Sequence, residues 1–146
     1  MKKIYLAAPF GTKDSELRKN VEEAAKILAE KGFEVFCPWK YTIPNAWDYP
    51  NSEWSQMVFM NDIHAIDNSD MVVMLSYGRE ATTAGTNWEA GYAFGTGKKV
   101  IVVEMKDEIM SLMVANGRYA TVKYLDGLKK YDFETMPKTR TNTEQK

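Results

Sequence analysis

The chain has 146 residues, 45% of them hydrophobic, and a formal net charge of −1. This length and apolar content fit one domain with a single core, and the interspersed charges exclude the clustered Lys/Arg surface that binds polyanions. One cysteine excludes a disulfide framework and a cysteine-based metal site. The first apolar run is too short for a signal peptide and no window approaches a membrane span, so we expect a soluble cytoplasmic protein.

Apolar stretches alternate with segments of helical periodicity. Strand character is found at residues 4–8, 33–37, 71–75, 100–103 and, more weakly, 120–124. Apolar residues at helical spacing predict four helices. The first runs from Asp14 or Ser15 to Gly32, and the second from Ser52, its N-cap, to about Asp67. The third runs from about Thr86 to Gly95 or Gly97, and the fourth over 108–115. The alternation predicts an α/β fold over 1–136: a single domain with a doubly wound, flavodoxin-like or Rossmann-like parallel five-stranded sheet flanked by helices. Residues 137–146 are predicted to form a polar, flexible tail.

The carboxyl ends of parallel strands meet at one edge of such a sheet, and ligands bind at that edge. We therefore expect residues 7–10, the loop after Cys37, the loop after Leu75 and the start of the Glu89 helix to converge. The loop 38–51 is long for a compact domain, which indicates a functional role. It carries four large aromatic residues: Trp39, Tyr41, Trp47 and Tyr49.

Glu89 stands at the start of the third predicted helix. Its spacing from Thr86 is that of a capping box, in which the glutamate bonds back to the Thr86 amide. The same position, at a strand-to-helix junction, also suits a catalytic carboxylate. In the first turn the helix dipole would keep that carboxylate ionised near neutral pH, as a nucleophile requires. Small neighbours, Gly85 and Gly91 among them, leave room for a ligand, but the spacing fits both interpretations.

Asp62 lies on the apolar stripe of the second predicted helix, four residues from Val58 and four from Ile66. A carboxylate there either pairs locally with a Lys or Arg or serves as a site acid. Two neighbouring carboxylates whose pKa values are pushed apart would give one nucleophile and one proton donor. Tyr5 is expected near the same sheet edge, where it either packs in the core or orients a carboxylate through its hydroxyl.

Other motifs carry less chemistry. His64, the only histidine, has no evident partner and is interpreted as a surface or half-buried residue. The Gly95-Thr96-Gly97-Lys98 segment precedes a strand instead of following one, which favours a helix end over a phosphate loop. No metal-ligand spacing is present, so we expect neither a metal nor another cofactor.

Three segments, in this order, resemble the nucleoside 2-deoxyribosyltransferases. They are residues 4–10 (Ile-Tyr-Leu-Ala-Ala-Pro-Phe), 61–63 (Asn-Asp-Ile) and 85–91 (Gly-Thr-Asn-Trp-Glu-Ala-Gly). Ser111-Leu112-Met113 is similar to the family's Asn-Leu-Met segment, and the resemblance covers roughly residues 3 to 135. It implies an enzyme of nucleotide salvage that transfers a 2-deoxyribosyl group between nucleobases without a cofactor and retains the β configuration.

The resemblance also implies roles for single residues. Glu89 would be the nucleophile that forms a covalent deoxyribosyl ester, Asp62 the acid that handles the base or its proton, and Tyr5 the group that positions Glu89. Thr83 stands where family members often carry a second acid, and Ser111 where their asparagine reaches a neighbouring subunit's sugar; Glu80 and Asn116 could substitute. The residues expected to contact substrate are Pro9, Phe10, Trp47, Trp54, Phe59, Thr83, Gly85, Ser111 and Asn116.

The implied partners are deoxyribonucleosides and free nucleobases, with no nucleic-acid polymer and no membrane. A homo-oligomer is also implied, based on dimers and extending to a hexamer, with sites completed between subunits. One alternative is an N-glycoside hydrolase of deoxynucleosides or deoxynucleoside 5′-monophosphates on the same fold, with the phosphate held by Thr12, Ser15 and the helix after Phe10. The other is a non-catalytic nucleotide-sensing module, which would bind nucleosides without turnover.

Overall fold

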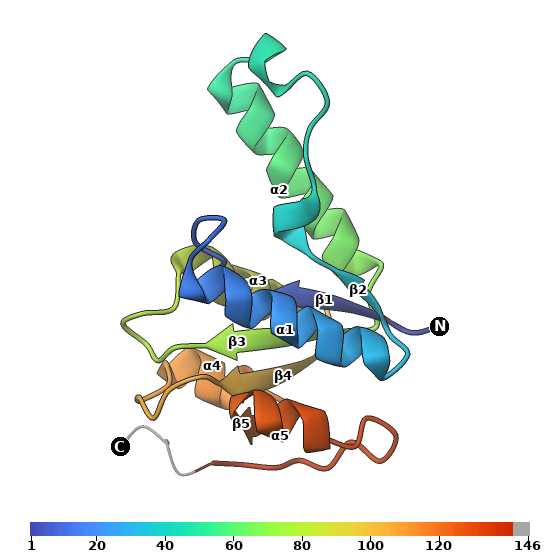
Figure 1. Ribbon diagram of the computed structural model, residues 1–146, viewed down its shortest axis with the longest axis vertical. Helices are drawn as coiled ribbons and strands as arrows, with labels where there is room; N and C mark the ends of the chain where they lie inside the picture. Colours follow the sequence, from blue (N-terminus) through green and yellow to red (C-terminus); the bar gives the residue numbers. More distant parts are fainter. Residues whose placement is uncertain (142–146) are drawn as a thin grey trace.

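Five strands form one parallel sheet in the order β2-β1-β3-β4-β5 (Figure 1). The computed structural model describes residues 1–141. The strands are β1 (Lys3–Ala7), β2 (Glu34–Phe36), β3 (Met71–Ser76), β4 (Lys99–Glu104) and β5 (Ala120–Lys123). From β1 the chain first steps outward to β2 and then crosses back to β3, so the strand order reverses between β1 and β3. Ligands bind at such a switch point in doubly wound sheets, and the predicted fold class is confirmed.

Helices cover both faces of the sheet (Figure 1). Helices α1 (Glu16–Glu30) and α5 (Tyr124–Lys130) pack on one face, while α2 (Asn51–Asp67), α3 (Ala84–Gly95) and α4 (Leu112–Gly117) pack on the other. Two 3-10 turns, Pro38–Lys40 and Ala46–Asp48, interrupt the loop between β2 and α2. Within residues 1–141, no helix is both long and apolar enough to cross a membrane.

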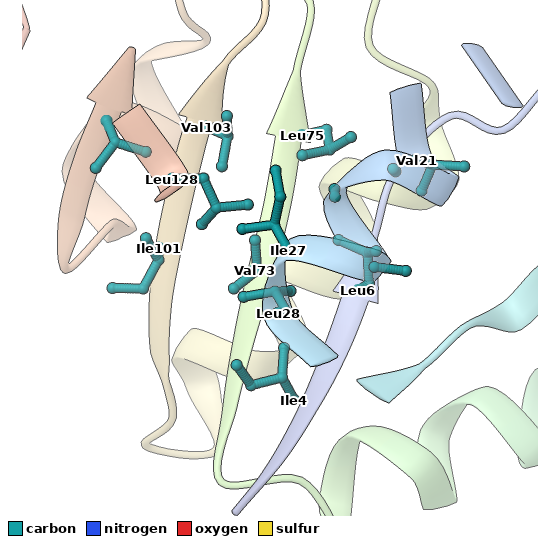
Figure 2. Close-up of a cluster of buried hydrophobic side chains, with 14 of the residues drawn as sticks. Ile4, Leu6, Val21, Ile27, Leu28, Val73, Leu75, Ile101, Val103 and Leu128 are labelled. Carbon is teal, nitrogen blue, oxygen red and sulfur yellow. The ribbon is translucent and has the colours of Figure 1, made fainter. Parts of the chain in front are cut away.

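The core consists of two apolar clusters, one on each face of the sheet. Because successive side chains of a strand point to opposite faces, Ile4 and Leu6 join the α1 and α5 side, whereas Tyr5 points to the α2 and α3 side. Figure 2 shows the first cluster, in which the aliphatic side chains of β1, β3 and β4 meet Leu28 of α1 and Leu128 of α5. The alternation therefore places the Tyr5 ring, which is fully buried, beneath the helix that carries Glu89.

Helix α2 extends well beyond the sheet (Figure 1). Its only fully buried residue is Ile66, close to its C-terminal end, and every residue from Asn51 to Gln56 is exposed. The predicted apolar stripe is therefore wrong for Trp54 and Phe59, whose side chains are 41% and 48% exposed. The periodicity identified the helix correctly, but the first six residues of α2 are exposed to solvent.

Three element boundaries differ from prediction. Ser52 is not an N-cap, because Pro50 is the N-cap and α2 starts at Asn51. The helix predicted over 108–115 is shorter and begins at Leu112. Helix α5 was not predicted at all: it follows β5 without a loop, since Tyr124 adopts a φ of +58° that turns the chain, and Gly127 interrupts its apolar pattern.

The first part of the predicted tail lies against the sheet edge. Thr139 accepts a hydrogen bond from the Thr121 amide at 2.9 Å and donates its hydroxyl to the Thr121 carbonyl at 2.8 Å. The Thr141 hydroxyl donates to Oε1 of the buried Glu104 at 2.6 Å. The remainder of the predicted tail, residues 142–146, lies outside the described residues.

Candidate active site

The centre of the site is a tyrosine–glutamate pair that joins β1 to α3. The Tyr5 hydroxyl donates a hydrogen bond to Oε2 of Glu89, and the Tyr5 ring stacks on Phe36 of β2 with centroids 5.3 Å apart. Burial raises the pKa of Tyr5 far above its ordinary value, and the charge of Glu89 adds to this, so the hydroxyl keeps its proton. The hydrogen bond lets Tyr5 orient Glu89, while its ring also packs in the core, so both interpretations of Tyr5 fit the structure.

The start of α3 places Glu89 in the second helical turn. The N-cap is Thr83, whose hydroxyl accepts from the Thr86 amide at 3.4 Å and lies 2.7 Å from the Thr86 hydroxyl. The capping-box interpretation is therefore wrong, because Glu89 bonds to Tyr5 and the cap is formed three residues before Thr86. The expected first-turn position of Glu89 is wrong for the same reason, and the helix dipole acts on it more weakly than anticipated.

Asp62 reaches the same cavity from α2. Burial raises the pKa of Asp62 to about 6. Burial also raises the pKa of Glu89 to about 7; the Tyr5 hydrogen bond opposes this shift, and the charge of Asp62 reinforces it. Because burial outweighs the Tyr5 hydrogen bond, Glu89 titrates near neutral pH, whereas the sequence favoured a carboxylate that stays ionised there. The charge of Asp62 acts on the Glu89 carboxyl group, so the two groups titrate as an interacting pair.

A cavity of about 790 Å³ surrounds these two carboxyl groups at the carboxyl edge of the sheet. Its walls come from the loops after β1, β2 and β3 and from α2 and α3, which confirms the predicted convergence. Within the part of the chain that the structure describes, Asp62 and Glu89 are the only ionisable groups that line the cavity. Predicted substrate contacts that line it are Pro9, Phe10, Phe59, Thr83 and Gly85.

Four predicted substrate contacts lie elsewhere. Trp47 is 92% exposed in the loop before α2, and Trp54 is exposed on the outer part of that helix. Ser111 and Asn116 line a separate, largely apolar cavity of about 390 Å³ between α3 and α4. Within residues 1–141, none of these four residues lines the Glu89 cavity, and their contact with substrate stays a prediction that requires a second subunit. His64 is exposed on α2, away from the Glu89 cavity.

Sequence reasoning missed several lining residues, among them Pro38, Ile63, Thr86 and Trp88. For two of these residues, the position in the sequence indicates proximity to the site. Ile63 follows Asp62 directly and shares a helical face with Phe59, and Trp88 precedes Glu89. No such indication exists for Pro38, because its position depends on how the loop after β2 folds.

The family model for nucleoside 2-deoxyribosyltransferases matches residues 4–135. The chain belongs to this family. Its fold is similar to the 2-deoxyribosyltransferase of the psychrotolerant bacterium Bacillus psychrosaccharolyticus, with a TM-score of 0.85 and 32% sequence identity over 95% of this chain and 98% of that chain. A search of curated proteins found no significant match.

More distant structures share the fold. The Clostridium botulinum CMP N-glycosidase has a TM-score of 0.57 and 20% identity, covering 84% of this chain and 89% of that chain. The 2-deoxyribosyltransferase of Leishmania mexicana has a TM-score of 0.57 and 17% identity, covering 98% of this chain and 85% of that chain. Family membership and the Bacillus structure together make this chain an enzyme of the nucleoside 2-deoxyribosyltransferase type.

Burial of Glu89 has a consequence for the stability of this deoxyribosyltransferase. The pKa of Glu89 rises from 4.5 to about 7 on folding, so the folded state binds more protons between these values and stability falls as pH rises. We expect Glu89→Gln to increase the free energy of unfolding by about 2 kcal/mol at pH 8, after allowance for partial exposure, and to have little effect at pH 4. Urea denaturation at both pH values checks this; an equal effect at pH 4 and pH 8 would contradict it.

Proposed function

We propose that the enzyme transfers a 2-deoxyribosyl group between nucleobases by double displacement, with Glu89 as the nucleophile. One observation carries the proposal: Glu89 is held by the Tyr5 hydroxyl inside a cavity that is also lined by the second carboxyl group, Asp62 of α2. A pair of carboxyl groups on two sides of a glycosidic bond is what retaining glycoside chemistry uses. The membership of the chain in the deoxyribosyltransferase family supports the same assignment.

In the first displacement an ionised Glu89 oxygen attacks C1′ from the face opposite the base. The C1′–N bond breaks, its electron pair goes to the base nitrogen, and the base takes a proton from Asp62. In the second displacement a nitrogen of the incoming base attacks C1′ and displaces the Glu89 carboxylate, while the proton from that nitrogen returns to Asp62. Two inversions at C1′ leave the β configuration unchanged.

The rest of the cavity suits a nucleobase beside a sugar. Phe10, Phe59 and Trp88 offer aromatic surfaces, and the walls are otherwise largely apolar. Such surfaces stack on any base because every base has a π-face. Thr83 and Gly85 line the cavity one or more turns of α3 before Glu89, and we infer that they contact the sugar.

Hydrolysis of nucleoside 5′-monophosphates is supported less well. The phosphate site considered for that activity uses Ser15, but the Ser15 hydroxyl already donates to the Thr12 carbonyl at 2.7 Å and accepts from the Arg18 amide at 3.1 Å. Arg18, the nearby cation, donates to the carbonyls of Phe10 and Gly11. These groups hold the loop after β1 in place and are not directed to a ligand.

An assay with thymidine and adenine tests the proposal. We expect deoxyadenosine and thymine in equal amounts, measured by liquid chromatography, with no added metal or cofactor. A parallel reaction with deoxycytidine 5′-monophosphate and no acceptor tests hydrolysis. Release of free sugar or sugar phosphate without base exchange would replace transfer by hydrolysis, and nucleoside binding without any turnover would point to a sensing module.

The outer half of α2 supports the proposal that the enzyme is a homo-oligomer. Large aromatic side chains are exposed on this helix and the loop before it, including Trp47, Tyr49 and Trp54. Clustered exposure of this kind marks an interaction surface, and a second copy placed there could complete the cavity. Sedimentation velocity should show a dimer or higher assembly, and Trp47→Lys should weaken it; a monomeric wild-type enzyme would contradict this.

A further inference from the structure

Helices α2 and α3 carry the two carboxyl groups, yet few contacts within the chain hold them together. In the middle of α2, the Phe59 ring meets the Trp88 ring of α3 edge-on, with centroids 5.4 Å apart. At the C-terminal end of α2, the half-buried Tyr92 of α3 donates its hydroxyl to Oδ1 of the exposed Asp67 at 2.6 Å. Asp62 and Glu89 lie between these two contacts, so the contacts set how far apart the carboxyl groups are.

We propose that the Tyr92–Asp67 hydrogen bond is a brace that fixes the separation of Asp62 and Glu89, and that Tyr92 and Asp67 are positioning residues for the proposed deoxyribosyl transfer. The inference rests on that proposed function, because the carboxyl separation matters only if the two groups act on one substrate. Neither residue lines the Glu89 cavity. They would act entirely through the helices that they join.

Helical spacing explains why this bond controls the site. Tyr92 is three residues after Glu89 and four after Trp88, so all three lie on neighbouring positions of one face of α3. The Trp88 and Tyr92 rings stack with centroids 5.7 Å apart and planes 7° apart. A movement of Tyr92 is therefore passed to the side chains that line the cavity.

The same end of α2 is held from a second side. Lys98, in the turn between α3 and β4, donates from Nζ to the Asp67 carbonyl at 3.1 Å and to the Ser69 carbonyl at 2.8 Å. Ile66, next to Asp67, is fully buried in the sheet-facing cluster. Since the outer half of α2 is exposed, its direction is set at this end, and a small rotation here becomes a larger displacement at Asp62 and Phe59.

Replacing Tyr92 by Phe removes the hydrogen bond and keeps the ring that stacks on Trp88. We expect kcat/KM for base exchange to fall about tenfold, since a misplacement of well under 1 Å between reacting groups is costly. The matched control is Tyr124→Phe, which removes an equivalent hydroxyl-to-carboxylate bond, to Asp107 at 2.9 Å, on a distant part of the surface. It should leave exchange unchanged.

Substitutions of Asp67 separate positioning from folding. Asp67→Asn keeps an oxygen that accepts the Tyr92 hydrogen bond, so it should exchange bases at nearly the wild-type rate. Asp67→Ala removes the acceptor and should lower kcat/KM as much as Tyr92→Phe does. The double variant, Tyr92→Phe with Asp67→Ala, should have the same kcat/KM as either single variant, because all three variants lack the same hydrogen bond. Fully additive losses would overturn the brace.

Titration of Glu89 provides a readout that does not depend on turnover. The titratable groups acting on Glu89 are Tyr5 from β1 and Asp62 from α2. If α2 moves away, Glu89 gains water and loses the nearby charge, so its pKa should fall from about 7 in Tyr92→Phe and Asp67→Ala but not in Tyr124→Phe or Asp67→Asn. NMR of 13C-labelled carboxyl groups measures this.

The two proposals fail in different ways. If the wild-type enzyme does not exchange bases, the proposed function is overturned, and the pKa of Glu89 in the variants still tests the brace. Active wild-type enzyme, together with unchanged exchange and an unchanged Glu89 titration in folded Tyr92→Phe, would overturn the brace alone. If Tyr92→Phe does not fold, the comparison of Asp67→Ala with Asp67→Asn decides in the same way.

Discussion

Glu89→Gln is expected to reduce kcat/KM for exchange between thymidine and adenine by about 10⁴-fold or more, because the amide cannot form the covalent intermediate. The Gln side chain keeps the size of Glu and still accepts the Tyr5 hydrogen bond. Nucleoside binding should therefore change little, and the loss should appear in kcat. Initial rates measured by chromatography over a range of thymidine concentrations separate the two parameters.

The same substitution at Glu80 is the control. Glu80 lies in the loop between β3 and α3, its side chain is 88% exposed, and it lines a pocket separate from the Glu89 cavity, so we do not expect it to substitute for the acid that family members often carry at the position of Thr83. Glu80→Gln should exchange bases at the wild-type rate. If Glu89→Gln retained even one-tenth of the wild-type exchange rate, Glu89 would not be the nucleophile.

Asp62→Asn is expected to lower kcat/KM by about 10² to 10⁴-fold, the usual contribution of a general acid. Wild-type enzyme should show a bell-shaped dependence of kcat/KM on pH, with limbs near the values of about 6 and about 7 for the carboxyl pair. At lower pH Glu89 is protonated and cannot attack; at higher pH both groups are ionised and no proton reaches the base.

The variant should change the shape of this profile as well as its height. Without Asp62 the limb on the high-pH side disappears, and the pKa of Glu89 falls because the neighbouring charge is gone. The residual activity should therefore rise with pH to a plateau and show no decline at high pH. Asp126→Asn, on α5 across the sheet, is the control. If the pH dependence of kcat/KM in Asp62→Asn keeps both limbs at their wild-type pH values, Asp62 is not the proton donor.

The sequence was sufficient to predict the sheet and the centre of the site. Near-continuous apolar runs such as residues 71–75 are typical of strands covered on both faces, and all six residues of β3 are indeed buried. Parallel strands bring their carboxyl ends together, so Tyr5, Asp62 and Glu89 could be assigned to one edge although Tyr5 and Glu89 are 84 residues apart.

The remaining features depend on tertiary packing. A capping box and a buried catalytic carboxylate share one sequence pattern, and only the position of Tyr5 beneath α3 separates them. The rise in the pKa of Glu89 comes from burial, which no local pattern reports. The exposure of Trp54 and Phe59 likewise follows from how far α2 extends past the sheet, and helical periodicity carries no information on this.

The covalent intermediate is the central claim, and mass spectrometry of enzyme quenched with acid during turnover of thymidine alone tests it most directly. The account predicts one deoxyribosyl group on the proteolytic fragment that contains Glu89. The adduct should be absent from Glu89→Gln and should be lost on addition of adenine as β-deoxyadenosine forms. Base exchange that proceeds without any adduct, or with the group on another residue, would contradict the account.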